Sequence, residues 1–441
     1  MKINKRIPAV FLAVLLMLFN TACLVNPQID GTNNNTSKAT SEDVSTSTTS
    51  ELPENTTTPE ATTTEANLES SFNVAMVGDV LYHSWLINGG YQEDGSYNYD
   101  YIYEYLQDEI GASDLAIANM EGTLAGEPYT GYPLFSAPNE VADMLALSGF
   151  NLITTVNNHY FDRGIAGQVA TLDVLQEAGL NTVGTRRSAE EPEYYSVDIN
   201  GVKVGVSAFT YETDMQGENI GINGIPIPKE YENLADSFSL EQPYINDDLI
   251  VVQERALQMR EDGMEVVIFV MHWGTEYLLY EDWFQGQYAQ ALANAGVDLI
   301  LGAGPHVVQP IKTISSSDGE SETLVYYSVG NAVSNQHYDT GRSVGHPLDG
   351  IVALVEFERD AEGEISISQA GYLPTLKQEY MTSDSASKTQ VIPVNRAVVN
   401  PAGFNVSADA VSASQARTRA IMAGNSTGEL EVKELDTLSF D

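Results

Sequence analysis

The chain of 441 residues has very little of several side chains that whole functional classes require. Cysteine occurs once, at Cys23, so neither an intrachain disulfide nor a cysteine-based zinc cluster can form. Lysine and arginine number 20 against 62 acidic residues, a formal net charge of −42. This charge repels phosphate backbones, which argues against nucleic acid as a partner, and it suits a cation-rich extracellular medium. Solubility alone would account for the acidity equally well.

The N-terminus has the layout of a secretory signal peptide. Basic residues open the chain, and residues 7–19 form an apolar segment that is too short to span a membrane comfortably. Small residues then precede Cys23, as in a bacterial lipobox. We therefore expect residues 1–22 to be a signal peptide and Cys23 to be lipidated, anchoring the protein on the extracellular face of the cell membrane. An ordinary signal peptide with an incidental cysteine is the alternative.

The next segment has almost no apolar side chains. Thr, Ser, Asn, Glu and Pro dominate from residue 26 to about residue 70. Such a segment cannot bury enough surface to offset ordering entropy, so residues 23–70 are expected to be the lipidated cysteine and a disordered tether. With 43% hydrophobic residues overall, the remainder can form a large core. We expect one domain over residues 71–424 and an acidic tail without clear structure over residues 425–441.

Within the predicted domain, short apolar runs alternate with helical patterns. Runs this short and apolar are typical of buried strands. The predicted strands are residues 72–77, 115–118, 152–156, 202–208, 266–271, 299–301, 324–327 and 351–357, with weaker ones at 372–374 and 391–394. Four predicted helices lead into the glycines at 149, 179, 263 and 296, as expected for left-handed caps, and a further helix is expected at 408–423. The repeat of helix, glycine and buried strand predicts a layered α/β domain.

Polar residues that can bind metals follow directly after six of these runs. The segments are Gly78-Asp79, Asn119-Met120-Glu121, Asn157-Asn158-His159, residues 272–276, residues 302–306 and residues 328–331. Strand ends in an open α/β sheet meet at one edge, so these side chains are expected to converge. Carboxylates, amide oxygens and imidazoles suit Mn, Mg, Fe or Zn, and one or two such ions could activate water. Taken singly, each residue could instead be a helix cap, a surface acid or a structural histidine.

Four segments in this order resemble the bacterial CapA family of poly-γ-glutamate capsule biosynthesis proteins. They are residues 157–164, 272–277, 305–310 and 327–331, and the resemblance extends from about residue 72 to about residue 374. That family is related to calcineurin-like metallophosphatases. The resemblance therefore implies a four-layer α/β/β/α sandwich of the metallophosphatase type.

The resemblance also implies a role for each site residue. The implied metal ligands are Asp79, Glu121 as a bridging acid, Asn158, His272 and His306. His159 would stabilise charge or protonate a leaving group, with Asp162 or another nearby acid orienting its ring. Two positions depart from the phosphatase pattern, since Leu81 and Gly304 stand where histidines are usual. We therefore expect weaker metal binding, and Gly304→His should restore a ligand and raise the metal content if the geometry of the family is retained.

Three functions fit these features. The first is a surface-tethered protein that acts in synthesis, export or anchoring of an anionic polymer such as poly-γ-glutamate, with the polymer or its synthesis machinery as partner. The second is a metal-dependent hydrolase of phosphoesters or of the polymer, and the third is a non-catalytic polymer-binding module with a degenerate metal site. The number of metal ligands separates the second from the third. A strongly acidic protein would repel a polyanion unless cations bridge the two or the site is locally positive.

Overall fold

The computed structural model describes residues 70–440 apart from 217–218, 242–243, 383–386 and 424–429. The predicted signal peptide, the lipidation site Cys23 and nearly all of the predicted tether lie outside the described residues. No helix in the described ranges has the length and apolar character needed to cross a membrane.

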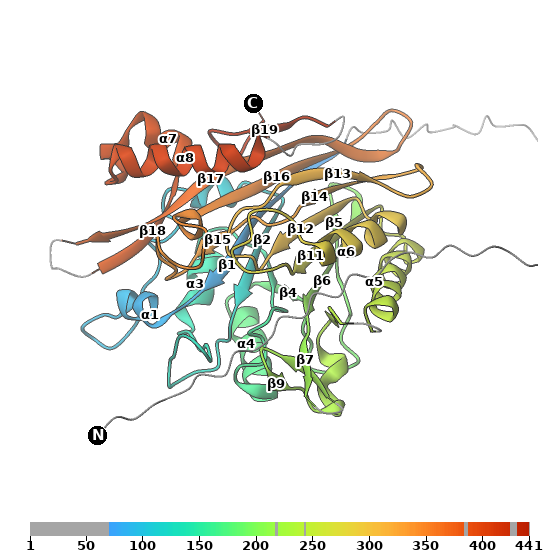
Figure 1. Cartoon of the computed structure of the whole chain (residues 1–441), viewed down its shortest axis with the longest axis horizontal. Coiled ribbons are helices and arrows are strands. Elements are labelled where there is room, and N and C mark those ends of the chain that lie inside the picture. Colours follow the sequence, from blue (N-terminus) through green and yellow to red (C-terminus); the bar gives the residue numbers. More distant parts are fainter. Residues whose placement is uncertain (1–69, 217–218, 242–243, 383–386, 424–429, 441) are drawn as a thin grey trace, which may run out of the picture. The chain divides into compact units, whose positions relative to one another are not determined.

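The first sheet combines a parallel half with an antiparallel half (Figure 1). Its strands run in the order β18-β17-β16-β1-β2-β3-β4; β15 also pairs with β1, and β19 with β17. Pairing is parallel from β1 to β4 and antiparallel from β1 through β16 and β17 to β18. The bounds are β1 Ser71–Leu81, β2 Leu115–Glu121, β3 Leu152–Thr154, β4 Asn181–Val183, β15 Asn331–Val333, β16 Asp349–Arg359, β17 Ile365–Met381, β18 Ser387–Pro393 and β19 Val432–Glu434.

The second sheet is mostly parallel, in the order β10-β6-β11-β12-β14-β13, and β5 pairs with β6. Its strands are β5 Tyr195–Ile199, β6 Val202–Tyr211, β10 Ser237–Phe238, β11 Val266–His272, β12 Leu299–Ala303, β13 Ile311–Ser315 and β14 Glu322–Tyr326. A small separate sheet contains β7 Thr213–Gln216, β8 Asn219–Ile222 and β9 Ile225–Pro226.

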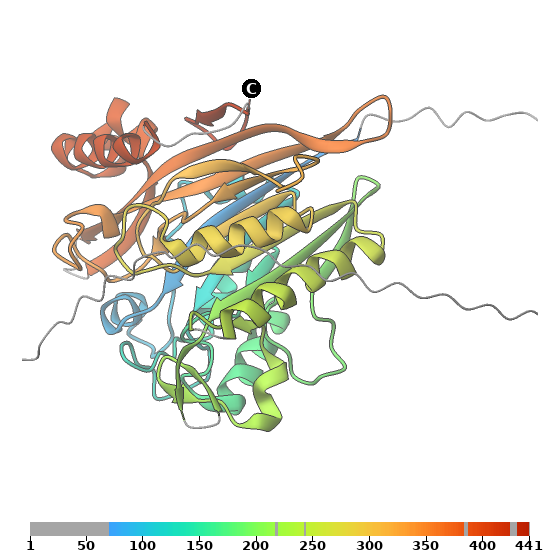
Figure 2. The same cartoon turned by 45° about the vertical axis from the view of Figure 1, so that its right-hand side comes forward.

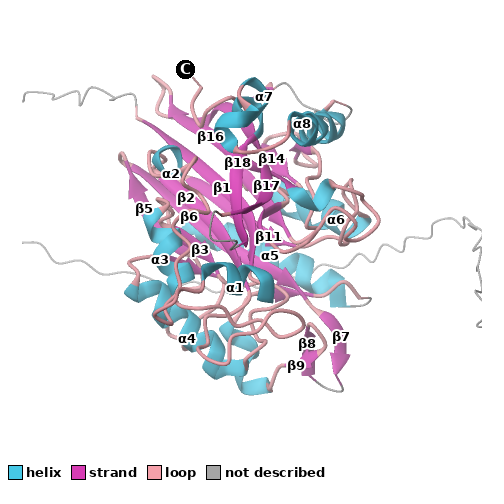
Figure 3. Cartoon of the chain, turned by 90° about the vertical axis from the view of Figure 1, so that its left-hand side faces the viewer, coloured by secondary structure: helices cyan, strands magenta, loops and turns pink. Residues whose placement is uncertain are grey.

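The two large sheets pack face to face with helices on their outer sides. Val74 and Met76 of β1 share one buried cluster with Val204 of β6 and Ile268 of β11, which places this cluster between the sheets. Side chains on the opposite face of β1 pack instead against helices α1, α3 and α4. The outer face of the second sheet packs against α5 and α6, the helices coloured yellow-green and gold in Figure 2. The expected four-layer α/β/β/α sandwich is therefore confirmed (Figure 3).

Most helix ends follow the sequence pattern. The helices are α1 Ser84–Gly90, α2 Gln107–Ile110, α3 Glu140–Leu147, α4 Gly164–Glu177, α5 Tyr244–Glu261, α6 Trp283–Asn294, α7 Val394–Val399 and α8 Ala408–Met422, with 3-10 turns η1 Lys229–Leu234, η2 His346–Leu348 and η3 Pro401–Phe404. Gly149, Gly179, Gly263 and Gly296 all have positive φ, between 74° and 92°, which confirms the four left-handed caps.

The C-terminal segment is more ordered than expected. Val432–Glu434 forms β19, which pairs in parallel with β17. The Glu434 carboxylate accepts hydrogen bonds from the Arg419 guanidinium at 2.8–3.1 Å, and Leu435 is buried. The prediction of a tail without clear structure is therefore wrong for residues 430–440. So short a strand, paired only with a distant segment, leaves almost no local pattern in the sequence.

Candidate metal centre

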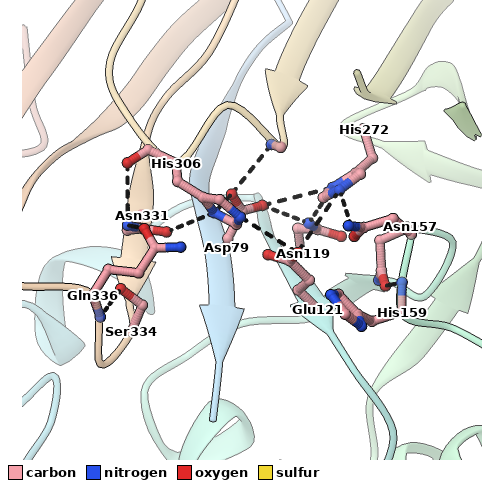
Figure 4. Close-up of polar contacts among 12 residues, drawn as sticks. Asp79, Asn119, Glu121, Asn157, His159, His272, His306, Asn331, Ser334 and Gln336 are labelled. Carbon is pink, nitrogen blue, oxygen red and sulfur yellow. Dashed lines mark hydrogen bonds and ion pairs between the residues drawn. The ribbon is translucent and has the colours of Figure 1, made fainter. Parts of the chain in front are cut away.

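The centre lies where strands of both sheets end. Asp79 lies near the C-terminal end of β1, and Glu121 and His272 are the last residues of β2 and β11. The strands continue through these polar residues because their backbones stay in the ladder, with Asp79 opposite Asn119 and Leu81 opposite Glu121. Predicted strands 72–77 and 115–118 were therefore too short. The sandwich brings the edges of the two sheets together at one buried point (Figure 4).

Three predicted ligands form a compact buried group. Asp79, Glu121 and His306 each offer a ligand atom, and these atoms all lie within 4.8 Å of one another. Nδ1 of His306 is 3.1 Å from Oδ2 of Asp79, and its Nε2 is 3.7 Å from Oε1 of Glu121. Two acids and one imidazole at this spacing are able to contact a single divalent ion.

His272 faces the same two carboxylates from the second sheet. Its Nδ1 is 3.7 Å from Oδ1 of Asp79, and its Nε2 is 3.9 Å from Oε1 of Glu121. Oδ1 of Asn158 is 3.1 Å from Nε2 of His272, so Asn158 borders the group. The structure thus brings all five predicted ligand residues together, while their role as ligands stays a prediction.

Glu121 provides the test of whether a metal ion fits. Its side chain is fully buried, and neither carboxylate oxygen has a hydrogen-bond partner among the residues that the structure describes. Burial, reinforced by the nearby Asp79 carboxylate, holds the pKa of Glu121 well above its usual value despite the opposing effect of His306. A buried carboxylate without a partner is costly, so the site requires a proton or a cation there. A divalent ion would supply the missing partner, and the residues present fit one.

The two histidines differ in their protonation. Burial lowers the pKa of His272 to about 4, so its ring is neutral at pH 7, as metal binding requires. Burial also acts to lower the pKa of His306, but the carboxylates of Glu121 and Asp79 outweigh it and raise that pKa to about 10. Without an ion, His306 is therefore an imidazolium paired with Asp79, and metal binding there must release its proton.

The predicted catalytic pair lies beside this group. Nδ1 of His159 is 2.8 Å from Oδ2 of Asp162, and the Phe135 N–H donates to the same oxygen at 2.7 Å. The Asp162 carboxylate is thus fixed and orients the His159 ring, as the sequence predicted. His159 and His306 both line a pocket of about 200 Å³, which contacts the candidate metal group.

The Gly304 position corrects one expectation. Gly304 has φ of +104°, and a Cβ there would lie 2.9 Å from the Trp273 carbonyl oxygen and 3.2 Å from Nε2 of His272. Its N–H also donates to Oδ2 of Asp79 at 3.2 Å. The expectation that Gly304→His restores a ligand is therefore wrong, because the backbone needs glycine and the space is occupied. Leu81, at the other departure, is buried at the pocket wall.

Three residues of the centre had no predicted role. The Asn119 amide donates to Oδ1 of Asp79 at 2.8 Å, and Oδ1 of Asn331 lies 3.1 Å from Nδ1 of His306. Such contacts orient the ligands of metal sites. His83 lines the pocket, burial lowers its pKa to about 4, and its Nδ1 has no partner among the described residues. Both asparagines occur in the polar segments at strand ends, and that position was the available signal.

A two-sheet sandwich with acids and histidines at one buried edge defines the class of protein, an α/β protein with a candidate metal centre. Within that class, the family model of the bacterial capsule synthesis protein PGA_cap matches residues 73–336, more than half of the chain. The chain belongs to that family, and the expectation drawn from the four segments is confirmed.

Individual relatives of the chain support the same family assignment. The chain is 26% identical over 274 residues to the capsule biosynthesis protein CapA of Bacillus anthracis, covering 60% of each chain. It is 26% identical over 281 residues to the PGA biosynthesis protein CapA of Bacillus subtilis (strain 168), covering 61% of this chain and 65% of that protein. The match thus spans less than two thirds of either relative. Among solved structures, the NAD nucleotidase NadN of Haemophilus influenzae has a TM-score of 0.44 at 13% identity, covering 82% of this chain and 65% of that one.

Proposed function

We propose that this protein takes part in the biosynthesis of an anionic capsule polymer such as poly-γ-glutamate, and that it acts there as a metal-dependent hydrolase of the polymer. Membership of the capsule synthesis family supports the first part. The observation that carries the second is the buried Glu121 carboxylate, which has no hydrogen-bond partner among the described residues and lies within 4 Å of two histidine rings, beside a pocket lined by His159.

The chain's own residues divide the work. Asp79, Glu121, His272 and His306, bordered by Asn158, would hold one or two divalent ions such as Mn, Mg, Fe or Zn. A bound ion would supply Lewis acidity and a water of lowered pKa. Asp162 occupies Nδ1 of His159, which leaves Nε2 as the atom that exchanges a proton with the leaving group. The pocket of about 200 Å³ limits the water around the reacting unit.

Metal analysis together with a hydrolysis assay tests this function. Purified protein is loaded with Mn, dialysed and analysed for bound metal, and the shortening of poly-γ-glutamate is followed by size-exclusion chromatography. We expect bound metal and metal-dependent shortening in the wild type, both lost in Glu121→Gln and both retained in the matched control Glu322→Gln, whose side chain is exposed. Bound metal with no shortening of the polymer would refute the hydrolase assignment and favour a binding module.

We also propose that the protein is held at the membrane surface through lipid on Cys23. The layout of the N-terminal segment and the chain's single cysteine at its end support this. A lipid-modified cysteine carries a diacylglyceryl group, and two chains suffice for stable attachment. Cys23→Ser should release the protein into the medium or leave it unprocessed. Unchanged recovery of that variant in the membrane fraction would contradict the proposal.

A further inference from the structure

A second and larger pocket adjoins the pocket of the metal centre. It has a volume of about 690 Å³, against about 200 Å³ at the centre, and the two share Glu276 and Tyr277 in their walls. Its other walls are Thr275, residues 278–280 and residues 341–343. The small pocket has room for about one unit of a polymer. A polymer that is cleaved at an internal bond therefore needs an adjoining pocket for the neighbouring units.

Arg342 is the cation of this larger pocket. It is exposed, and its side chain makes no hydrogen bond or ion pair with any residue that the structure describes. In a chain with 62 acidic and 20 basic residues, most cations are already paired, as Lys312 is with Glu281 and Arg417 with Asp349. An unpaired arginine offers a planar, bidentate partner for a carboxylate. It places a positive charge in the wall of this pocket although the protein as a whole is acidic.

The loop that carries Arg342 is held against Tyr277. A Cβ on Gly341 would lie 2.3 Å from the Tyr277 ring, so only glycine allows this close contact. On the other side of Arg342, the Ser343 hydroxyl donates to the Tyr277 carbonyl oxygen, and the Gln336 amide donates to the Tyr277 hydroxyl at 3.1 Å. Tyr277 itself has φ of +62°, a conformation that is uncommon for non-glycine residues and persists only where the surrounding contacts hold it. Both neighbours of Arg342 are thus fixed at the edge of the metal-centre pocket.

Glu276 determines where a carboxylate of a bound ligand can lie in the two pockets. It is exposed and lines both pockets, so it repels a ligand carboxylate at their junction. A carboxylate further along the chain is instead attracted to Arg342. One acid followed by one base fits a ligand with carboxylates at regular spacing, and Leu278, Leu279 and Tyr280 supply apolar walls for the methylene groups between them.

We infer that the larger pocket is a subsite for the polymer units that flank the unit in the metal centre, and that Arg342 binds the carboxylate of one flanking unit. This inference rests on the proposed function and adds to it a site that binds internal units of a polymer that carries carboxylates. Arg342 is a specificity residue and takes no part in holding the metal.

Binding of γ-linked glutamate oligomers of increasing length to the Mn-loaded, full-length protein tests the inference by calorimetry. We expect affinity to rise with length in the wild type. Arg342→Gln should remove that rise, weakening long oligomers roughly five- to tenfold while leaving the shortest unchanged. Glu276→Gln should tighten the long oligomers. Lys203→Gln is the matched control, because it removes one exposed positive charge at the opposite end of β6 from the site.

Each alternative result is distinct. Equal weakening by Arg342→Gln and Lys203→Gln would show general electrostatic attraction and overturn the subsite. No effect of Arg342→Gln on length dependence would overturn it too, while the metal and hydrolysis results above would still stand. A wild type that binds metal yet no oligomer of any length would overturn both the subsite and the choice of polymer.

Discussion

Replacement of Glu121 by glutamine should stabilise the metal-free protein and lose most or all of that advantage when metal is bound. In the metal-free protein the Glu121 side chain is 0% exposed, and within the described part of the chain neither of its oxygens has a hydrogen-bond partner. Nε2 of His306 and Nε2 of His272 are 3.7 and 3.9 Å from Oε1, beyond hydrogen-bond distance. Such a carboxylate is a source of instability that a bound ion would remove.

The expected sizes follow from this geometry. A buried polar group without a partner costs about 1–3 kcal/mol, and a charged one costs more. Glutamine keeps the shape and cannot ionise, so it avoids the cost of holding a proton or a charge on the buried carboxylate at neutral pH. Glu121→Gln should therefore raise the free energy of unfolding of the metal-free protein by about 1–3 kcal/mol. At an ion concentration 100-fold above Kd, binding adds about 2.7 kcal/mol to the wild type. A ligand loss that weakens binding by about a hundredfold leaves about 0.4 kcal/mol of that gain, so the advantage of the variant shrinks by about 2.3 kcal/mol.

Urea unfolding followed by tryptophan fluorescence, in EDTA and in excess Mn, measures both differences. Glu322→Gln should match the wild type in both buffers. The reasoning is refuted if Glu121→Gln is less stable than the wild type in EDTA, because the carboxylate then has structural partners. Equal stabilisation of both proteins by Mn would show that Glu121 is not a ligand.

Three further outcomes are expected. Gly304→His should lower metal content in elemental analysis, because a Cβ there meets the Trp273 carbonyl oxygen at 2.9 Å; unchanged content would contradict this. His159→Asn should keep metal content and lower turnover about 10²- to 10⁴-fold, and a loss of metal would make His159 a ligand instead. Arg417→Met should cost about 3 kcal/mol of unfolding free energy above pH 7 and less below pH 5. Burial, only partly offset by Arg417, raises the pKa of Asp349 to about 6, so the folded state holds the extra proton and stability falls as pH rises from about 4 to that pKa. Without Arg417 the fall should be deeper and extend to higher pH, and a pH-independent loss would refute this account.

The central strands could be predicted because both of their faces are buried. In β1, Val74 and Met76 face the other sheet while Ala75 and Val77 face helices, which leaves a continuous apolar run in the sequence. The long strand β17 (Ile365–Met381) was predicted only at residues 372–374. Its N-terminal part is only partly buried, and polar side chains interrupt it near its C-terminal end. Its pairing with β16 and β18 is a tertiary effect that local pattern does not contain.

The sequence could predict which residues form the candidate site, but it could not predict how they are arranged in space. Position after a buried strand was enough to select Asp79 and His272, yet these residues belong to different sheets, and strand order within one sheet does not place them together. Their approach to 3.7 Å depends on how the sandwich aligns two sheet edges. Gly304 shows the same limit. In the sequence, glycine at this position indicates only that a histidine ligand is missing. In the structure, its positive φ and close surroundings require glycine, and its backbone N–H donates to Asp79. The geometry of the centre therefore depends on a close backbone approach as well as on its side chains, and a count of histidines in the sequence does not contain that approach.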